Sequence, residues 1–473
     1  MPSLLASARR VSLAAILTFA DVGAPWASVG FPDPGGQRDP FRHIQALQEI
    51  ATANAGNRAA GTPGYDRSAE YVAEQLRGAG YAVRFEEFTF PFFKERSRPI
   101  LVAGSARPDA LVLPQEALRT LGNSGSGDVA ARLQAVDLGL EEEPLKASTS
   151  GCEREDFEGF APGSIALVRR GTCPFQSKVE NAQAAGAAGV IIMNQGTEGQ
   201  TGTFGGRLMT LAAIPVLGVT TEAGRRLDAA ARDPAGLEIR LKIDVETGIR
   251  TTRNVIAERD AIHESFVVVG AHLDSVPEGP GMNDNASGTA AVLETALRLA
   301  RHPATGTPIR FAFWGAEERG LLGSRHHLDA IPEEERRRIA LYVNLDMVGS
   351  ANPGRFIQLT QPTKAGLVES TIQALVGHFD RHGLAVEERT GRLRGFGSDD
   401  ATFASKGIPT IGLFTGAGET KSEPHALRFG GTAGQPFDPC YHKACDTELN
   451  VDRQVLGQIT DALTHALGQA LSH

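Results

Sequence analysis

The chain has 473 residues, of which 41% are hydrophobic and 22% are charged, as in ordinary soluble globular proteins. Its 47 basic and 56 acidic residues give a formal net charge of −9, which argues against a nucleic-acid-binding protein with a basic surface. The length predicts two or three domains, and no block of like charge is long enough to indicate an interaction tail.

The first 30 residues have the pattern of a secretory signal peptide. Arg9 and Arg10 precede a mostly apolar run, residues 11–20, and small residues follow it. This run is too short to span a bilayer, which takes about 20 residues. A disordered or anchoring N-terminus is the alternative interpretation. We expect residues 1–30 to be removed and no other segment to cross a membrane, so that the mature protein is secreted, to the periplasm or outside the cell.

The four cysteines are consistent with an oxidising compartment. They form two local pairs in the sequence, Cys152 with Cys173 and Cys440 with Cys445. Two disulfides within these pairs are the simplest of the three possible connectivities. A cysteine-bound zinc ion is the weaker alternative, because neither pair has the two-residue spacing of a zinc knuckle.

Two helices and a strand are predicted at the start of the mature chain. Residues 41–54 and 67–80 have helical apolar periodicity, and residues 81–93 alternate like a strand. The pattern changes between about residues 129 and 243. There, residues 163–194 predict a strand, a turn, an alanine-rich helix and a second strand, with no cluster of acids and bases.

Hydrophobic strands alternate with helices in the last 210 residues or so. The predicted strands are residues 264–274, 308–318, 338–349 and 408–416. The predicted helices begin at residues 286, 319, 366 and 450. Continuous apolar strands in this alternation predict the α/β class, with a mostly parallel sheet between two layers of helices. In such sheets, functional sites form beyond the carboxyl ends of the strands.

Polar residues follow the predicted strands at the places where such a site would form. Six residues stand out: His272, Asp284, Glu317, Glu318, Asp346 and His442. Two histidines and three carboxylates suit two zinc ions, with one carboxylate shared between the ions. A further carboxylate beside a ligand, but free of metal, suits a general base.

Five motifs in order resemble the di-zinc exopeptidases of the secreted aminopeptidase S and vacuolar aminopeptidase Y type. The motifs are "GAHLDS", "NDNASGTA", "WGAEERGLLGS", "NLDMVG" and "CYHKACDT", and "RAAGTPGYDRSAEYVAEQL" near the start also matches. The resemblance covers nearly the whole mature chain. It implies a zinc exopeptidase of the phosphorylase/hydrolase-like fold that is secreted, binds two zinc ions and hydrolyses peptides with a free N-terminus.

Residues 163–195 resemble a protease-associated (PA) domain, and Cys152 upstream fits the same pattern. This resemblance implies a small β-rich domain that is inserted into the enzyme, that covers or gates its cleft and that has no chemistry of its own. The expected organisation is a signal peptide at residues 1–30, a catalytic domain at 38–125 and 246–473, and the PA insert at 126–245.

The resemblance also assigns the metal ligands. It makes Asp284 the carboxylate that bridges the two zinc ions, and Glu318 and Asp346 the terminal carboxylate ligands. It makes His272 a ligand of one zinc ion and His442 a ligand of the other.

Three further residues are expected to take part in catalysis. The resemblance gives Glu317 the role of general base and Tyr441 the role of steadying the tetrahedral intermediate. Asp274 is two residues after His272 and therefore on the same side of an extended chain, where it can support the imidazole.

The loop "GFGSDDATF" departs from the family pattern. Gly397 stands where some relatives have an arginine that helps to hold the intermediate, and Arg392 or Arg394 could replace it. Asp399 and Asp400, which follow, are interpreted either as supporting groups or as turn residues.

Three alternative functions stay open. A PA-domain carboxypeptidase of the glutamate-carboxypeptidase type needs a basic pocket, which Arg392 and Arg394 could supply. A glutaminyl cyclase shares the fold but uses one zinc ion. A non-catalytic binding protein on the same fold would lack a ligand or Glu317, and the sequence retains all of them.

Overall fold

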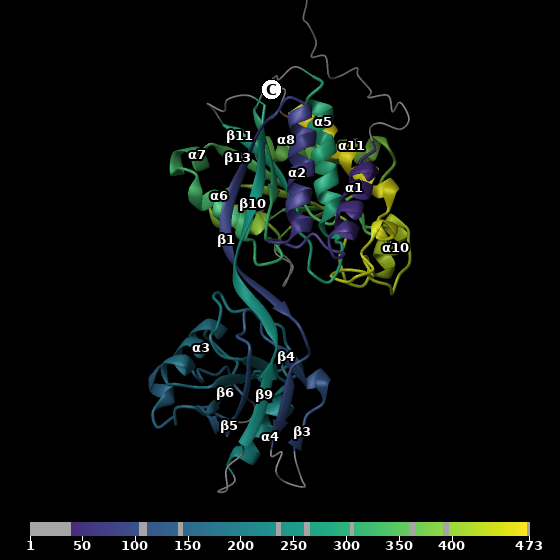
Figure 1. Ribbon diagram of the computed structural model, residues 1–473. Helices are drawn as coiled ribbons and strands as arrows, with labels where there is room; N and C mark the ends of the chain where they lie inside the picture. The colour runs from purple at the N-terminus through teal and green to yellow at the C-terminus, as the bar shows by residue number, and fades with distance from the viewer. Residues whose placement is uncertain are drawn as a thin grey trace, which may run out of the picture.

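The computed structural model describes residues 39–470, apart from residues 104–110, 141–144, 233–237, 260–264, 303–306, 360–365 and 391–396. The predicted signal peptide, residues 1–30, lies outside the described residues. The described residues form two lobes joined by two long strands (Figure 1). These strands, β1 (Ala82–Glu95) and β10 (Val245–Glu258), pair antiparallel along their whole length.

The larger lobe contains an eight-stranded sheet with the strand order β1-β10-β12-β11-β13-β16-β14-β15. The central strands β12, β11, β13 and β16 run parallel, and the pairs β1–β10, β10–β12 and β14–β16 are antiparallel. The bounds are β11 (Phe266–His272), β12 (Ile309–Trp314), β13 (Ile339–Leu345), β14 (Phe356–Leu359), β15 (Glu387–Thr390) and β16 (Thr410–Phe414). The predicted α/β class is therefore confirmed.

Helices cover both faces of this sheet (Figure 1). One face packs against α1 (Phe41–Ala53), α2 (Pro63–Gly78), α5 (Gly288–Leu299), α8 (Gly366–Arg381) and α11 (Arg453–Ala470). The other face packs against α6 (Leu322–Ala330) and α9 (Asp400–Ser405), near α7 (Glu333–Arg337). Successive residues of β11 alternate between the two cores: Val267 and Val269 face the first group, and Val268 faces the second. Because both faces are buried, the central strands are apolar throughout.

The smaller lobe is built on a second eight-stranded sheet, with the order β3-β2-β9-β5-β6-β7-β8-β4. Its strands are β2 (Ile100–Ala103), β3 (Leu111–Val112), β4 (Leu118–Thr120), β5 (Gly127–Ala135), β6 (Ile165–Arg169), β7 (Gly189–Met193), β8 (Val216–Val219) and β9 (Glu238–Ile243). Helices α3 (Phe175–Ala184) and α4 (Thr221–Ala231) pack on it.

The second sheet begins at Ile100, so three of its strands precede the expected start of the insert at residue 126. These strands are two to four residues long, too short to give a periodic signal in the sequence. Both predicted disulfides, Cys152–Cys173 and Cys440–Cys445, are present. Within the described ranges, no helix is long and apolar enough to cross a membrane.

Candidate active site

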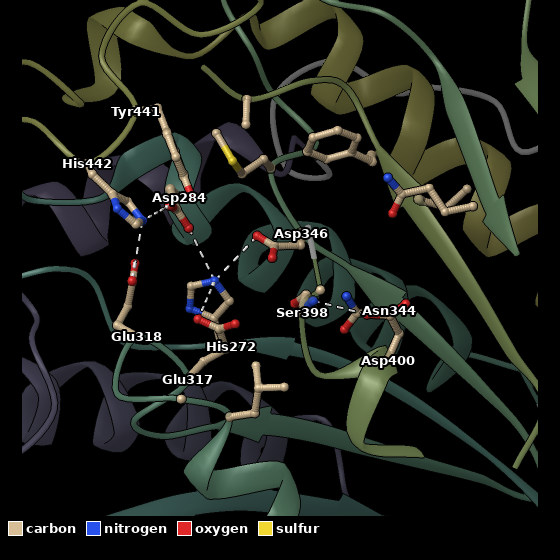
Figure 2. Close-up of a pocket in the computed structure, with 18 of the residues that line it drawn as sticks. His272, Asp284, Glu317, Glu318, Asn344, Asp346, Ser398, Asp400, Tyr441 and His442 are labelled. Atoms are coloured by element: carbon tan, nitrogen blue, oxygen red, sulfur yellow. Dashed lines mark hydrogen bonds and ion pairs between the residues drawn. The ribbon is translucent and has the colours of Figure 1, made fainter. Parts of the chain in front are cut away.

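A cavity of about 450 Å³ lies beyond the carboxyl ends of the central parallel strands (Figure 2). Strand β11 ends at His272, β13 ends one residue before Asp346, and β12 ends three residues before Glu317. Because these strands are parallel neighbours, their ends meet at one edge of the sheet. Seven of the eight predicted site residues line the cavity: His272, Asp284, Glu317, Glu318, Asp346, Tyr441 and His442. The eighth, Asp274, is fully buried behind them.

Asp284 lies between the two histidines. Its Oδ1 is 3.2 Å from Nε2 of His272, and its Oδ2 is 3.0 Å from Nε2 of His442. The same His272 nitrogen is 3.3 Å from Oδ1 of Asp346. The same His442 nitrogen is 3.3 Å from Oε2 of Glu318. The donor atoms therefore form two groups that share Asp284, as the dashed lines in Figure 2 show.

Glu317 lies beside these two groups. Its Oε2 is 4.0 Å from Nε2 of His272. Together with His272 and Glu318 it forms a third set of donor atoms, all within 4.8 Å of one another. Glu317 is therefore a neighbour of the two donor groups that contain Asp284 and a member of neither.

The turn that carries the two glutamates is held from behind by Asp274. Its carboxylate accepts hydrogen bonds from the backbone N–H groups of Glu317, at 3.0 Å, and Glu318, at 3.3 Å. The contact between Asp274 and His272 is made mainly by the backbone, because Nδ1 of His272 is 3.0 Å from the Asp274 carbonyl oxygen and 3.7 Å from its carboxylate. Asp274 therefore supports both the imidazole and the glutamate turn.

A buried arginine holds the loop that leads to Asp284. Arg58 is inaccessible to solvent and donates hydrogen bonds to the carbonyl oxygens of Pro280, at 3.0 Å, Gly281, at 2.6 Å, and Leu273. Gly281 has a φ of +65°, and a Cβ there would lie 2.3 Å from the Asp284 carbonyl oxygen. The loop needs glycine at this position for both reasons.

The backbone at Asp284 is fixed from the other side by Asp446. The buried Asp446 carboxylate accepts hydrogen bonds from the N–H groups of Asn283, at 2.8 Å, and Asp284, at 3.0 Å. Asn450 also donates to it, at 2.9 Å. The peptide bond between Asp284 and Asn285 is cis. The Asp284 side chain thus projects from a backbone that is held at several points.

Four residues beside or within the site have left-handed backbone conformations, among them Leu321, which lines the cavity with a φ of 60°. Ala316, just before Glu317, has a φ of 55°, and Met347, just after Asp346, has a φ of 51°. His442 itself has a φ of 56°. Non-glycine residues seldom adopt this conformation, and such strain concentrates at functional sites.

Tyr441 and His442 stack on each other, with ring centroids 3.9 Å apart. Both lie within the short loop closed by the Cys440–Cys445 disulfide. Burial and the nearby carboxylates, Asp284 first among them, raise the pKa of the Tyr441 hydroxyl far above its usual range. Tyr441 thus stays protonated and can donate a hydrogen bond into the cavity.

The carboxylates lie close enough together to shift one another's protonation. Burial raises the pKa of Glu317 well above its usual value, and burial together with Asp284 raises the pKa of Glu318 to about 7. Although burial lowers the pKa of His442, its hydrogen bonds to Asp284 and Glu318 raise it to about 11. The cluster therefore has an excess of negative charge that cations would offset.

The donor set fits zinc. Oε1 of Glu318 and Oδ1 of Asp346 are buried and accept no hydrogen bond from the described residues. Buried carboxylate oxygens that accept no hydrogen bond are costly unless a cation contacts them. Imidazole nitrogens and carboxylate oxygens are the ligands that zinc takes in catalytic sites. Three groups of three donors are present among the described residues, and two of them share Asp284.

Asp399, left open in the sequence analysis, is fully buried next to the cavity. Burial raises its pKa to about 7, and the charge of His272 acts against this shift. Gly397, Ser398 and Asp400 line the cavity. The arginines expected to replace the family arginine, Arg392 and Arg394, lie outside the described residues.

Sequence reasoning did not single out Arg58, Asp446 or Arg207. Arg58 begins the motif "RAAGTPGY" and Asp446 follows Cys445, so both stand in recognised motifs, but their partners are far away in the sequence. Arg207 belongs to the insert, which was expected to have no chemistry of its own, and yet it lines the cavity.

Comparisons with known proteins agree with this fold and site. The pattern of peptidase family M28 matches residues 254–467, and that of the PA domain matches residues 134–227. The chain is 42% identical over 432 residues to an aminopeptidase of Pseudomonas aeruginosa, covering 89% of this chain and 78% of the relative.

Two solved structures are similar over almost their whole length. The aminopeptidase from Aneurinibacillus sp. strain AM-1 has a TM-score of 0.69 and 27% identity, covering 91% of this chain and 93% of that one. The zinc aminopeptidase BSAP from Bacillus subtilis has a TM-score of 0.61 and 27% identity, covering 92% of this chain and 96% of that one.

A mixed sheet with clustered histidines and carboxylates beyond its central parallel strands, joined to a PA insert, defines the class of zinc exopeptidases. This chain belongs to peptidase family M28. The resemblance noted in the sequence and the predicted fold with an inserted PA domain are confirmed.

Proposed function

We propose that this protein is an aminopeptidase that holds two zinc ions in the cavity and removes N-terminal residues from peptides. The observation that carries the proposal is the pair of three-residue donor groups that share Asp284. The three similar proteins described above are aminopeptidases, one of them named a zinc aminopeptidase, in agreement with the predicted class of enzyme.

Each donor group is assigned one ion. His272 and Asp346 would hold the first ion and His442 and Glu318 the second, with Asp284 shared. Bound zinc would lower the pKa of a water molecule and polarise the scissile carbonyl. The protein contributes the fixed placement of the ligands, through the hydrogen bonds of Asp274, Asp446 and Arg58.

Glu317 is assigned the role of general base. It stands outside both groups that contain Asp284, within reach of the space between them. Its carboxylate takes a proton from the attacking water and passes it to the leaving amine. A pKa raised by burial suits a group that must both accept and return a proton near neutral pH.

Tyr441 is assigned to the developing oxyanion, to which its hydroxyl donates a hydrogen bond. The amino end of the peptide is assigned as the site of cleavage because the similar proteins described above are aminopeptidases.

We further propose that the enzyme is exported. The two disulfides fit an extracytoplasmic compartment, and residues 1–30 have the pattern of a removable signal.

The proposal is tested by hydrolysis of a panel of amino-acid p-nitroanilides, beside N-blocked p-nitroanilides and N-blocked dipeptides with a free C-terminus. We expect cleavage of the free-amine substrates only, loss of this activity with a chelator and recovery with zinc. Cleavage of the N-blocked dipeptides instead would assign a carboxypeptidase. Zinc binding without hydrolysis of any substrate would assign a binding protein.

A further inference from the structure

One end of the cavity is lined by polar side chains that the proposed mechanism does not use. Asn344, Gln358 and Ser398 line the cavity, and none of the three belongs to a group of candidate metal ligands. Figure 2 shows Asn344 and Ser398 on the side of Asp346 that faces away from His442. The cavity therefore continues past the candidate metal centre into a polar end.

Two of these residues flank a glycine of the central sheet. Strands β13, β16 and β14 are neighbours, and their register places Asn344 opposite Gly412 and Gly412 opposite Gln358. Ile411 and Leu413, on either side of the glycine, belong to the core beneath α8 and α11, so the row of three residues faces the other side of the sheet. The strands of the two amides are about 10 Å apart, with no side chain between them at Gly412.

The side chain of Gln358 lies close to this glycine. A Cβ at Gly412 would be 3.2 Å from Oε1 and 3.3 Å from Cβ of Gln358, closer than ordinary contacts. A side chain at position 412 would therefore take up the space between the two amides. The amide of Gln358 makes no hydrogen bond to another described residue, so it can turn its oxygen or its nitrogen toward a ligand.

The orientation of the Asn344 amide is set by two buried aromatic residues. Nε1 of Trp314 donates a hydrogen bond to the Tyr342 hydroxyl at 2.9 Å, and this hydroxyl donates to Oδ1 of Asn344 at 2.7 Å. Since an indole N–H can only donate, the tyrosine proton goes to the asparagine oxygen. Nδ2 of Asn344 makes no hydrogen bond to another described residue, although the residue is only 3% exposed. Asn344 therefore offers the cavity an N–H donor that lacks an acceptor.

The packing around Tyr342 keeps this orientation. Its ring stacks on that of Phe403, with centroids 3.8 Å apart and planes 8° apart. A Cβ at Gly270 would lie 2.8 Å from Nε1 of Trp314 and 3.0 Å from the Tyr342 hydroxyl oxygen. The glycine thus leaves the room that the two aromatic side chains need to reach each other.

Ser398 adds a third polar group. Its Oγ is buried and has no hydrogen-bond partner among the described residues. Its backbone N–H donates to Oδ1 of Asp400 at 3.1 Å, at the start of α9. Buried polar atoms without partners are costly, and a hydroxyl can both donate and accept. A ligand with a donor and an acceptor would therefore satisfy groups that the described residues leave without partners.

We propose that this polar end binds the side chain of the residue that is removed, and that it selects a primary amide, that of glutamine first. This inference rests on the proposed function and names its substrate class. The N–H of Asn344 donates to the carbonyl oxygen of the amide, and the oxygen of Gln358 accepts from its NH₂ group. A site of this kind rejects side chains without the amide, because its own polar groups are then left unpaired.

The length of a glutamine side chain fits the position of the polar end. Asn344 precedes Asp346 by two residues, which span about 7 Å along an extended chain. A glutamine side chain reaches roughly 5 Å from its Cα, and a hydrogen bond adds roughly 3 Å. Phe414 and Met347 line the same cavity and can contact the methylene groups. Asparagine is one methylene shorter and is expected to be a poorer substrate.

Charge and hydrogen bonding separate glutamine from side chains of similar length. A glutamate side chain would add a negative charge to a cavity that carboxylates already line. The ammonium group of lysine has only donors and would leave the N–H of Asn344 without an acceptor. Methionine has a similar length and no amide.

The test compares kcat/KM for the p-nitroanilides of glutamine, methionine, glutamate and lysine, with the full-length, zinc-loaded enzyme. We expect the value for glutamine to exceed each of the others by about 10-fold or more. Asn344→Asp keeps an acceptor for Tyr342 and removes the donor. We expect this variant to lower the ratio of glutamine to methionine about 5- to 30-fold.

Two further variants separate binding from positioning. Gln358→Met removes the second amide at similar size and is expected to lower the same ratio. Tyr342→Phe frees the Asn344 amide to turn, and its ratio is expected to fall between those of wild type and Asn344→Asp. Gln373→Met is the matched control, because Gln373 is an exposed glutamine on α8 that contacts Glu369. We expect it to keep the wild-type ratio.

Two results would overturn this inference. One is a wild-type enzyme that does not prefer glutamine to the other three residues, and the other is a wild-type ratio in folded Asn344→Asp and Gln358→Met variants. Both results leave the proposed function intact, since that function requires only the cleavage of free-amine substrates such as leucine p-nitroanilide. An enzyme that cleaves no free-amine p-nitroanilide would overturn the proposed function itself, so the two failures are distinguishable.

Discussion

The carboxylate of Asp274 accepts a hydrogen bond from the backbone N–H of Glu317, at 3.0 Å. This bond ties the end of β11 to the turn after β12, so that one buried residue positions the candidate base through its carboxylate and the candidate ligand His272 through its backbone carbonyl. Residues that hold metal ligands in position by hydrogen bonds strongly affect the metal affinity and the activity of a site.

Replacing Asp274 tests whether the glutamate turn must be held. We expect Asp274→Ala to lower kcat/KM about 10- to 100-fold, because both backbone N–H groups lose their acceptor and the turn is released. Asp274→Asn keeps one acceptor oxygen and is expected to lose less. The control is Asp329→Ala, a half-exposed aspartate that pairs with Lys406. Equal activity of Asp274→Ala and the control would contradict this role.

The two disulfides give a matched comparison. Cys440–Cys445 closes a short loop around Tyr441 and His442, whereas Cys152–Cys173 lies in the smaller lobe. Replacing both cysteines of the short loop with serine removes the cross-link. The unfolded chain then gains conformational entropy, which lowers the free energy of unfolding by about 2 kcal/mol. We expect zinc binding that is weaker on the order of tenfold, measured by competition with a chelator. The variant with serines at Cys152 and Cys173 is expected to keep the zinc affinity, and a similar loss in both variants would count against the prediction.

A buried ion pair away from the site predicts acid sensitivity. Glu86 contacts Nδ1 of His327 at 2.8 Å and Arg84 at 3.0 Å. Although burial raises its pKa, the hydrogen bond and charge of His327 lower it from 4.5 to about 2. Because the folded-state pKa is depressed, the pair stabilises the fold above about pH 4.5 and loses this effect as the pH falls toward 2. Above about pH 4.5 the ion pair contributes about 3 kcal/mol to the free energy of unfolding.

Trp314 reports on this region, because its ring lies 5.3 Å from that of His327. We expect the free energy of unfolding of the metal-free protein, measured with denaturant and followed by Trp314 fluorescence, to fall between about pH 5 and about pH 2. The loss in wild type should exceed that in Glu86→Gln, whereas Glu333→Gln, an exposed glutamate paired with Arg337, should behave like wild type. Parallel pH profiles for wild type and Glu86→Gln would contradict the assignment.

Metal removal is expected to destabilise the larger lobe. The carboxylates of the cavity repel one another when no cation is bound, and a ligand that binds only the folded state stabilises it. Free zinc at 100 times its dissociation constant should add about 2.7 kcal/mol per site. The melting temperature measured with and without chelator checks this, with magnesium as the control because it prefers all-oxygen sites. A melting temperature that does not change with zinc would contradict a metal site.

The central sheet and most of the site were predictable because their signals are local. Strands such as β11 are continuous apolar runs, and His272 and Asp346 stand at or just past the ends of such runs. The parallel order of the strands then brings them to one edge of the sheet. The helices begin and end within a few residues of the predicted bounds, as α1 and α8 show.

The remaining features depend on contacts that the sequence does not display. Strands β2, β3 and β4 are too short to have a period, so the first strands of the second sheet were missed. Arg58 contacts a loop more than 200 residues away, at Gly281. Arg207 reaches the cavity only because of the way the lobes are arranged, and no motif marks it. Long-range packing of this kind has no local signature.

The central claim is that Glu317 is the general base and that its neighbour Glu318 is a zinc ligand. The most direct test measures the zinc content and the activity of Glu317→Gln and Glu318→Gln. We expect Glu317→Gln to keep two zinc ions per chain and to lose about 10²- to 10⁴-fold in kcat, as for a missing general base. We expect Glu318→Gln to lose one zinc ion. Loss of zinc from Glu317→Gln with two ions kept by Glu318→Gln, or an active Glu317→Gln enzyme, would contradict the account.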